Sequence, residues 1–365
     1  MSQPLPILMT GSEWFATRPG GLNRYFYELF SATARLEDAS PSGAAFGDAP
    51  EIPGALSWEA GGDTRSRVLA SRRPIPGVRP RVVDRHFSLY GPPRRRYPDA
   101  LQIVHFQGPW ADESRVAGGG RASTAMKRVV ERRRYHDADH LIVLSAPFKA
   151  ILVEKYGIAP ERVTILAPGV DAGRFAAARG DGASQAAERP TVLCVRRLEH
   201  RMGIDVLIRA WDDISRSVPD AELRIVGTGT AEDELRELAT RSAKPGSITF
   251  AGRLSDEALV AAYSAATISV VPTTQLEGFG LIALESLAAG KPVVVTDCGG
   301  LPDGVKGLDP SLVVTPGDET ELARRITEAL LGKRPSAAEC VAHAKTFSWE
   351  SVAQRHLALY RELGA

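Results

Sequence analysis

Short apolar runs alternate with amphipathic segments along nearly the whole chain, and each run has the length of a buried strand. Strands that alternate with helices are typical of parallel sheets built from βαβ units. In the first half we predict strands at Pro6–Thr10, Arg81–Val83, Leu101–Phe106, Leu141–Leu144 and Val163–Leu166. In the second half we predict them at Thr191–Val195, Glu222–Val226, Ile248–Phe250, Ile268–Val271, Pro292–Thr296 and Leu312–Val314. The pattern therefore indicates an α/β protein.

Two stretches lack this alternation. One of them, residues 176–190, is rich in Ala, Gly, Ser and charged side chains, which is typical of a linker. The other, residues 38–67, contains several Pro and Gly, so we expect a loop there with one short strand at most. The predicted organisation is a first domain, 1–175; a linker, 176–190; a second domain, 191–347; and a final helix, 348–365, with Ser348 as its N-cap.

Composition narrows the class of protein. The 365 residues are enough for two ordinary domains, and 44% apolar with 24% charged residues is a globular profile. A net charge of +1 gives no global field that would attract nucleic acid. The cysteines are scattered, which suits a reducing compartment, and no apolar run approaches the ~18 residues of a membrane span. Because the N-terminus also lacks a basic-then-apolar leader, we expect a cytoplasmic protein without a transmembrane segment.

The stretch Glu277–Glu285 (EGFGLIALE) follows an apolar strand and combines a glycine-containing loop with the start of a helix. Backbone N–H groups and the positive helix end then point at one place, which favours an anion. Glu277 at the loop rim and Glu285 further along the helix are suited to accept hydrogen bonds from hydroxyl groups. One anion between two hydroxyl-rich groups describes a nucleotide-sugar. The alternative is a capped helix with a surface Glu and one buried polar residue.

EGFGLIALE, followed by AGKPVVVTD at 289–297 and GGLP at 299–302, resembles family 4 of the retaining glycosyltransferases. The resemblance implies the GT-B fold, with two Rossmann-like domains facing each other across a ligand cleft. In that family the last helix crosses back to the N-terminal, acceptor-binding domain, and the second domain binds the donor. The implied donor contacts are Glu277 with the sugar, Glu285 with the ribose, and Gly278, Phe279, Gly280 and Leu281 with the diphosphate.

Two arginines follow the first strand of the second domain, and planar guanidinium groups can clamp phosphate oxygens. The family has Gly-Arg-Leu here and a Lys just before the next Gly. This chain has Arg196 in place of that Gly and Met202 in place of that Lys. We carry the family arginine over to Arg197 and infer that Arg201 replaces the missing lysine. The alternative for both is a solvated arginine.

Two further segments of the second domain match donor-binding segments of the family. Gly227 lies in a tight turn after a strand, although a lone Gly-x-Gly more often only shapes a turn. Arg253 and Leu254 lie in the segment whose backbone holds the nucleobase in the family. Backbone recognition leaves little side-chain signal, so uracil and guanine both remain open.

In the first domain, a glycine-containing loop lies between the first strand and an amphipathic helix. Gly21 would let the backbone approach the diphosphate at that helix N-terminus. By the same resemblance, Asn23 and Arg24 would face the acceptor. The alternatives are an ordinary strand–helix turn for Gly21 and an exposed helix face for Asn23 and Arg24.

The segment Val104–Trp110 ends a strand and continues into a loop. The family has a His here that touches the donor sugar, but the aligned residue is Gln107, and His105 lies two residues earlier. A period of two puts both on one face of the strand, so either is a candidate for the sugar contact. The alternative for His105 is a buried structural role. Trp110 is a candidate for stacking on the acceptor, with packing as the alternative.

Asp137 and Asp139 are spaced like the DxD motif of metal-dependent glycosyltransferases. That motif follows a strand, whereas this pair precedes one, so we reject a metal site. Basic residues on the preceding helix could meet an anionic membrane or acceptor, but a solvated helix face is favoured. We expect no metal cofactor, because arginines and a helix N-terminus supply positive charge beside the diphosphate.

The implied function is metal-independent transfer of a sugar, with retention, from a UDP- or GDP-sugar to a small-molecule or glycan acceptor. We expect front-face substitution, in which the leaving diphosphate oxygen accepts the proton of the acceptor. The catalytic candidates are Glu277, Arg197, and either Gln107 or His105. The alternatives on the same scaffold are a sugar epimerase, a phosphorylase or a catalytically silent binding protein.

Overall fold

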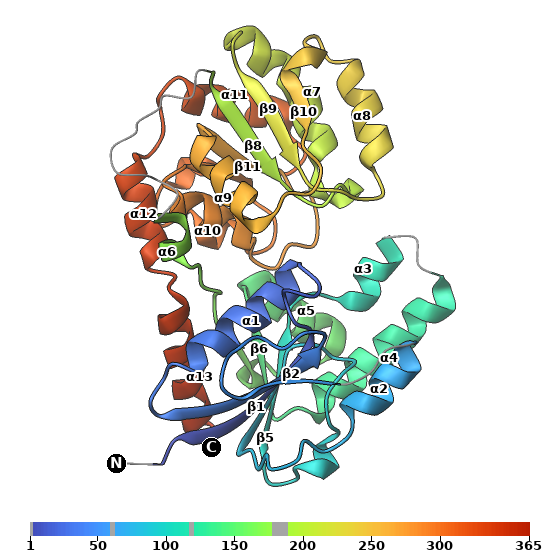
Figure 1. Ribbon diagram of the computed structural model, residues 1–365. Coiled ribbons are helices and arrows are strands. Elements are labelled where there is room, and N and C mark those ends of the chain that lie inside the picture. The colour runs from blue at the N-terminus through green and yellow to red at the C-terminus, as the bar shows by residue number, and fades with distance from the viewer. Residues whose placement is uncertain (1–2, 59–62, 117–119, 177–188) are drawn as a thin grey trace. The chain divides into compact units, whose positions relative to one another are not determined.

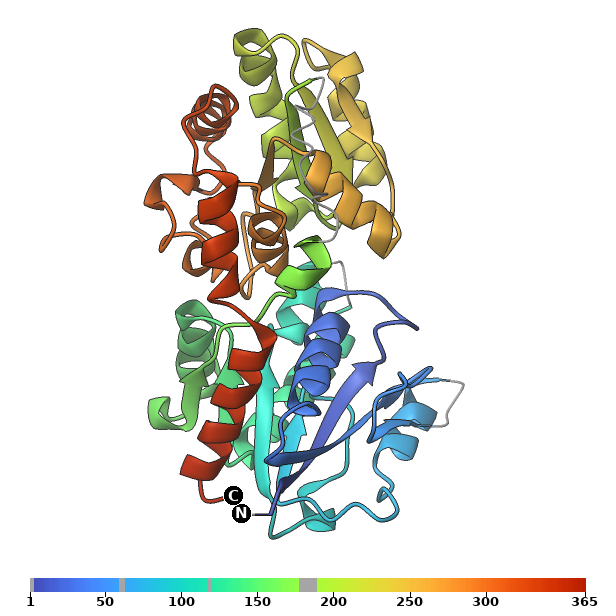
Figure 2. The same cartoon turned by 60° about the vertical axis from the view of Figure 1, so that its left-hand side comes forward.

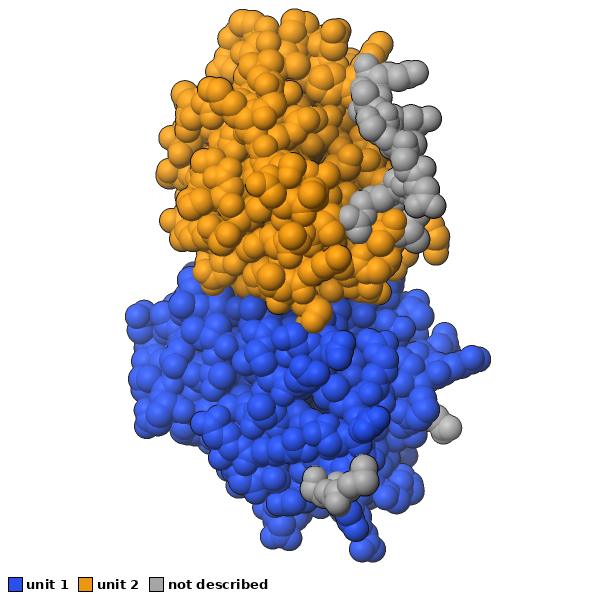
Figure 3. All heavy atoms as spheres, turned by 90° about the vertical axis from the view of Figure 1, so that its left-hand side faces the viewer, with its two compact units in different colours: residues 1–169, 349–365 blue, residues 170–348 orange. Residues whose placement is uncertain are grey.

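The computed structural model of the chain describes residues 3–58, 63–116, 120–176 and 189–365. The chain forms two compact units (Figures 1 and 3): unit 1 contains Met1–Gly169 and Trp349–Ala365, and unit 2 contains Val170–Ser348. The chain therefore enters unit 2 once and returns to unit 1 for its last helix. Among the described residues, none of the helices combines the length and the apolar character that a membrane crossing needs.

Unit 1 contains a seven-stranded parallel sheet in the order β3-β2-β1-β4-β5-β6-β7. The order in which successive strands are added reverses at β1, as in doubly wound folds. Its strands are β1 (Leu5–Glu13), β2 (Ala39–Phe46), β3 (Ala55–Ser57), β4 (Val82–Arg85), β5 (Leu101–Phe106), β6 (His140–Val143) and β7 (Val163–Ile165). Its helices include α1 (Gly21–Thr33), α2 (Thr64–Ser71), α3 (Trp110–Val116), α4 (Arg121–Asp137), α5 (Ala146–Tyr156) and α13 (Trp349–Glu362).

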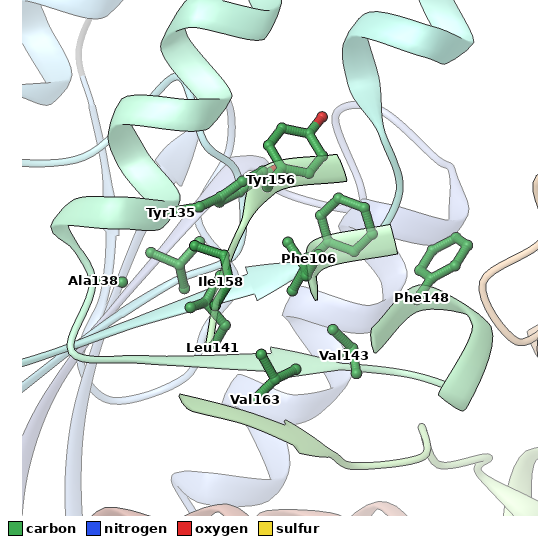
Figure 4. Close-up of a cluster of buried hydrophobic side chains, with 11 residues drawn as sticks. Phe106, Tyr135, Ala138, Leu141, Val143, Phe148, Tyr156, Ile158 and Val163 are labelled. Carbon is green, nitrogen blue, oxygen red and sulfur yellow. The ribbon is translucent and has the colours of Figure 1, made fainter. Parts of the chain in front are cut away.

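Aromatic side chains fill the space between the sheet of unit 1 and helices α4 and α5 (Figure 4). The ring of Phe106 on β5 lies edge-on to Tyr135 of α4 at 5.6 Å and to Phe148 of α5 at 5.3 Å. Strands β4 and β6 are buried at every position, as expected for a parallel sheet covered on both faces. The end of α13 lies close to the start of β1 (Figures 1 and 2).

Unit 2 contains a six-stranded parallel sheet in the order β10-β9-β8-β11-β12-β13. Its strands are β8 (Thr191–Val195), β9 (Glu222–Val226), β10 (Ile248–Phe250), β11 (Ile268–Val271), β12 (Val293–Thr296) and β13 (Val313–Val314). Its helices include α6 (Ala172–Ala176), α7 (Ile204–Ser217), α8 (Glu232–Thr240), α9 (Asp256–Ala265), α10 (Leu281–Ala288), α11 (Glu319–Leu330) and α12 (Ala337–Lys345). Helix α7 buries one face, including Leu207, Trp211 and Ile214, as its apolar spacing requires.

Each predicted strand overlaps an observed strand, so the α/β interpretation is confirmed. The loop expected at 38–67 is wrong, because this stretch contains β2, β3 and the start of α2. Strand β2 escapes recognition because small residues replace the usual β-branched ones. A Cβ at Gly43 would lie 2.8 Å from the ring of Phe30, so the rings of the covering helix occupy the space that side chains of β2 would take.

The segment predicted as a linker lies largely at 177–188, outside the described residues. Helix α6, which the sequence analysis assigns to the first domain, belongs to unit 2. Its Phe175 is buried with its ring edge-on to Tyr263 at 5.8 Å, and this packing attaches the segment to α9.

Candidate functional site

Loops that follow neighbouring strands of unit 2 meet with their backbones in contact. A Cβ at Gly227, after β9, would lie 1.9 Å from the carbonyl oxygen of Arg196, after β8. A Cβ at Gly299, after β12, would lie 1.8 Å from the carbonyl oxygen of Glu277, after β11. Both glycines have positive φ angles, +137° and +59°, so these positions require glycine on two grounds. The predicted residue Gly227 thus has a demonstrable role in loop packing.

The motif predicted to bind the diphosphate forms the start of α10. Gly280 is its N-cap with φ +82°, and Leu281 is its first residue. Phe279 is buried, with its ring 6.0 Å from that of Phe347, so only its backbone remains for a ligand. Just before the motif, Leu276 has φ +55°, the one positive value among the described non-glycine residues. Such a conformation costs about 1 kcal/mol or more and is often found beside functional groups.

The carboxylate of Glu277 forms an ion pair with Arg196. The same Nη2 of Arg196 donates to the hydroxyl of Thr273 at 2.6 Å and lies 2.8 Å from the sulfur of Met202. Arg196 is buried, whereas Arg197 is exposed, because successive residues of an extended segment point to opposite sides. No sequence pattern predicts this pair, because Arg196 and Glu277 lie 81 positions apart and Arg196 stands out only as a departure from the family pattern.

The two arginines predicted to clamp phosphate are in different situations. Arg197 is exposed, and no partner for its guanidinium is found among the described residues. Arg201 donates to the carbonyl oxygens of Gln275 at 3.3 Å and Leu276 at 2.7 Å, and its own carbonyl accepts from Thr274 at 2.9 Å. The guanidinium of Arg201, a candidate for binding phosphate, thus holds the strained loop before Glu277 through these hydrogen bonds.

The second acidic residue, Glu285, is buried on α10. Its carboxylate accepts a hydrogen bond from the hydroxyl of Tyr263 at 3.1 Å and lies 3.9 Å from the guanidinium of Arg174. Arg174 also pairs with Asp256 at 3.3 Å. No motif points to this arginine, because it lies 111 positions before Glu285 and outside the predicted donor domain.

The predicted base-binding segment follows β10. Arg253 is exposed and Leu254 is half-buried, while the preceding Gly252 accepts the backbone N–H of Gly227 at 2.8 Å. The turn after β9 is thereby joined to the turn after β10. The side chains give no indication of which base would bind.

In unit 1, the glycine loop after β1 leads directly into α1, which begins at Gly21. A Cβ added at Gly20 or Gly21 would meet nothing within 4 Å, so sterics within the protein do not require glycine there. Asn23 is buried and its amide donates to the carbonyl of Arg18 at 2.8 Å and accepts from the N–H of Glu13 at 3.4 Å. Both ends of the Asn23 side-chain amide thus hold the loop between Glu13 and Arg18.

Two other acceptor candidates make contacts within unit 1. The guanidinium of Arg24 lies over the ring of Phe15, 4.1 Å from its centroid. Trp110 is the first residue of α3 and is half-buried. Its ring lies edge-on to that of Phe87, with 5.5 Å between the centroids, and the ammonium of Lys127 lies over the Trp110 ring, 5.0 Å from its centroid. These contacts match the packing alternative for Trp110.

Gln107 and His105 are separated by the end of β5. His105 is fully buried, with its ring stacked on His86 at 3.9 Å and its Nε2 2.9 Å from a carboxylate oxygen of Asp84. This burial and these contacts match the structural alternative for His105. Gln107 lies beyond the strand and is half-buried, and its side-chain nitrogen has no partner among the described residues. Both ring nitrogens of His105 also lack a hydrogen-bond partner among the described residues, so the two candidates differ in burial, which is complete for His105 and partial for Gln107.

His105 belongs to a buried group that joins the sheet of unit 1 to α13. We call Asp84, His86, His105, His356 and Tyr360 the Asp84 network. Asp84 accepts from Tyr360 at 2.8 Å and contacts His86 at 3.1 Å. Burial, with the charge of His105, lowers the pKa of His86 to about 4 and that of His356 to about 3. Asp84, His86 and His105 are close enough to hold a metal ion, and they are the one such group among the described residues.

The segment that contains the rejected DxD motif makes contacts within unit 1, and Arg94 donates both to the carbonyl of Asp137 at 3.0 Å and to Asp139. Asp139 accepts from the backbone N–H of Gln102 at 2.9 Å and from Arg94 at 2.8 Å. His140 is bonded to Thr164 at 2.8 Å. The carboxylate of Asp139 thus joins β5 to the end of α4.

Two protein families match the chain in consecutive stretches. Residues 19–174 match the family described as Glycosyltransferase Family 4, and residues 182–347 match the family described as Glycosyl transferases group 1. A D-inositol 3-phosphate glycosyltransferase of Rhodococcus jostii is 32% identical over 263 residues, which cover 67% of this chain and 57% of that protein. A GDP-mannose-dependent alpha-(1-6)-phosphatidylinositol monomannoside mannosyltransferase of Mycobacterium tuberculosis is 32% identical over 249 residues, 61% of this chain and 64% of that protein. The chain thus spans less than two thirds of the length of these curated relatives.

Solved structures agree on the fold. A sucrose-phosphate synthase of Thermosynechococcus elongatus matches with a TM-score of 0.75 and 23% identity, over 99% of each chain. At this identity the likeness concerns the fold alone. The chain thus matches the two glycosyltransferase families one after the other along its sequence, and its two Rossmann-like units have the GT-B fold.

Proposed function

We propose that the chain is a retaining glycosyltransferase that moves a sugar from a nucleotide-diphosphate sugar to an acceptor hydroxyl. The observation that carries this proposal is the arrangement at α10. A glycine-containing helix start lies between two largely buried carboxylates, Glu277 and Glu285, and the exposed Arg197 extends from the neighbouring part of the same sheet edge. Carboxylates suit hydroxyls, and the helix start and the guanidinium suit a diphosphate.

Within this proposal unit 2 binds the donor. The diphosphate would lie against the N–H groups of Gly278–Leu281 and the guanidinium of Arg197. The ribose would bind Glu285 and the sugar would bind Glu277. Arg201 supports the site by fixing the loop at Leu276 rather than by binding phosphate. Unit 1 would present the acceptor and contribute the amide of Gln107.

The proposed reaction is a front-face substitution. The bond between the anomeric carbon and the diphosphate oxygen breaks, the acceptor oxygen bonds to that carbon from the same face, and the acceptor proton passes to the leaving oxygen. Negative charge grows on the diphosphate as this happens, so fixed N–H groups and Arg197 lower the barrier. We propose that this charge stabilisation proceeds without a metal cofactor.

The two relatives guide the choice of substrates. The name of the first refers to D-inositol 3-phosphate. The name of the second refers to phosphatidylinositol monomannoside and to GDP-mannose. We therefore propose GDP- and UDP-hexoses as donors and inositol-containing compounds as the first acceptors to screen.

The test is a mass-spectrometric screen of each donor with and without each acceptor. The proposal predicts a product one sugar residue heavier than the acceptor, together with release of the nucleoside diphosphate. A sugar epimerase would change the donor without any acceptor, and a phosphorylase would require inorganic phosphate. A binding protein would bind nucleoside diphosphates without turnover.

A further inference from the structure

Arg196 is a buried cation that the proposed reaction does not use. Its side chain is 6% exposed, and that of Glu277, its ion-pair partner, is 14% exposed. The pair therefore lies largely out of water, inside the loops that form the donor site. Burial of a charged group raises the free energy of the folded state unless an opposite charge and hydrogen bonds compensate for the lost water.

Among the described residues, the contacts of the Arg196 head group pass through one nitrogen. Nη2 reaches Glu277, the hydroxyl of Thr273 at 2.6 Å and the sulfur of Met202 at 2.8 Å. The Nε of Arg196 is buried and has no partner among the described residues. An incompletely bonded buried guanidinium is a poor source of stability, so a role in the site accounts for it better than a role in folding.

The donor poses an electrostatic problem that Arg196 is placed to solve. A diphosphate at the start of α10 lies next to Glu277 along the chain, and like charges repel strongly where water is excluded. An ionised Glu277 without a counter-charge would therefore weaken donor binding. The guanidinium of Arg196 supplies the counter-charge and holds the carboxylate in place.

We propose that Arg196 is a positioning residue that neutralises and orients Glu277, so that an anionic nucleotide-sugar can bind beside that carboxylate. This inference rests on the proposed function. Met202 belongs to the same arrangement, because its side chain contacts the guanidinium and a cation at position 202 would oppose it. The two departures from the family pattern, at 196 and 202, are thus in contact and act together.

Besides Arg196, two ionisable residues have contacts or charge interactions near Glu277. Arg201 is bonded to backbone carbonyls of the loop, and Cys298 lies nearby with its thiol pKa raised by burial, so it stays neutral. In Arg196→Met the carboxylate of Glu277 lacks this counter-charge, and because protonation removes the charge of a carboxylate, the loss of donor binding should be smaller at lower pH.

The experiment compares Arg196→Met, Arg196→Lys, Glu277→Gln and the double variant Arg196→Met/Glu277→Gln. Arg189→Met, which removes an exposed arginine paired with Glu222 at the other end of β8, is the control. Donor KM and kcat are measured from pH 5.5 to 8.5, with the melting temperature of each variant at the same pH values. Calorimetric binding of UDP and GDP to the wild type shows whether the donor site exists at all.

Arg196→Met should raise the donor KM at pH 8 by about tenfold or more, and the KM should fall toward the wild-type value as pH falls. Arg196→Lys should restore much of the binding. In the double variant, the KM should be lower than in Arg196→Met at pH 8 and independent of pH. The wild type and Arg189→Met should show no such trend.

Two results would overturn the proposal in distinguishable ways. If Arg196→Met lowers the melting temperature while donor KM keeps the wild-type value and pH profile, or if the effects of the two substitutions simply multiply, Arg196 is only structural. If the wild type binds neither nucleoside diphosphate and turns over no nucleotide-sugar, the proposed function fails and this role fails with it.

Discussion

Glu277 and Glu285 are held differently although both belong to one nine-residue motif. Glu277 pairs with a full guanidinium charge at the loop rim, whereas Glu285 accepts from the Tyr263 hydroxyl one turn into α10. In the proposed site Glu277 touches the sugar whose carbon reacts, and Glu285 touches the ribose, which is unchanged in the reaction. The two residues should therefore contribute to different kinetic constants.

Glu285→Gln should mainly raise the donor KM, because ribose is bound alike in the ground and transition states. Glu277→Gln should lower kcat by more than it raises KM, because misplacement of the reacting sugar slows the chemical step. Initial rates against donor concentration would separate the two effects. Equal effects from both substitutions, or a larger kcat loss at Glu285, would contradict the donor orientation proposed here.

Arg197→Ala should lower kcat/KM by at least about 100-fold, as the loss of one charge-stabilising donor does elsewhere. Arg197 is exposed, so the variant should melt at the wild-type temperature. Arg216→Ala, at an exposed pair with Asp213 on α7, is the control and should leave the rate unchanged. A loss below roughly threefold would rule out a phosphate role for Arg197.

At the residue scale, sequence reasoning located Glu277, Glu285 and Arg197, because a strand, loop and helix bring these residue types to one sheet edge. It did not find Arg196 or Arg174 as their partners. Each partner is distant along the chain, and only the packing of one loop on another brings the charges together. For His105 the sequence left a sugar contact and a buried structural role both open, because its neighbours Asp84 and His86 come from another segment of the chain.

At the scale of elements, the loops of unit 2 depend on close backbone approach. Gly299→Ala should destabilise the protein by at least about 2 kcal/mol, since its Cβ would lie 1.8 Å from the carbonyl of Glu277 at φ +59°. Gly317→Ala is the matched control, with φ +80° and nothing within 4 Å, and should cost about 1 kcal/mol for strain alone. Urea unfolding of both variants measures the difference. Equal costs would show that the loop after β11 adjusts freely.

The Asp84 network links α13 to the sheet of unit 1 and should make its stability depend on pH. His86 and His356 have pKa values of about 4 and about 3 in the folded chain, below the ~6.5 of an unfolded histidine. The unfolded chain therefore binds more protons between pH 6.5 and 4, and stability should fall as pH falls through this window. For His86 the loss between pH 7.5 and 5 should be about 2 kcal/mol.

Urea unfolding of His86→Gln between pH 7.5 and 5 tests this link. The variant should be less stable than wild type at pH 7.5 and should lose less stability on acidification, because one titrating group is gone. His200→Gln, at an exposed histidine of unit 2, should keep the wild-type pH dependence. An unchanged slope in His86→Gln would mean that His86 does not control the acid response.

At this scale the strand predictions succeeded because apolar runs of strand length mark buried parallel strands. Strand β2 was missed because Gly43 and its small neighbours give no apolar signal and make room for Phe30 and Trp14 of the covering layer. The pattern along one segment does not show which large side chains from another segment will pack over it.

At the scale of the whole molecule, the chain has two Rossmann-like units with the GT-B fold, and its sequence matches Glycosyltransferase Family 4 and then Glycosyl transferases group 1. The order of strands and helices predicted this class of fold from the sequence. The acceptor could not be predicted, because the loops of unit 1 that would meet it have no repeated chemical pattern. Asn23, Arg24 and Trp110 show the difficulty, since each makes contacts within unit 1.

The most direct test of the central claim is a proton NMR time course of one reaction with a donor and acceptor from the screen, run with and without EDTA. The account predicts that donor disappears only when acceptor is present and that nucleoside diphosphate and product appear in equal amounts. It also predicts that the transferred sugar keeps the anomeric configuration of the donor and that EDTA leaves the rate unchanged. Inversion at the anomeric carbon, loss of donor without acceptor, or a requirement for an added divalent metal would contradict it.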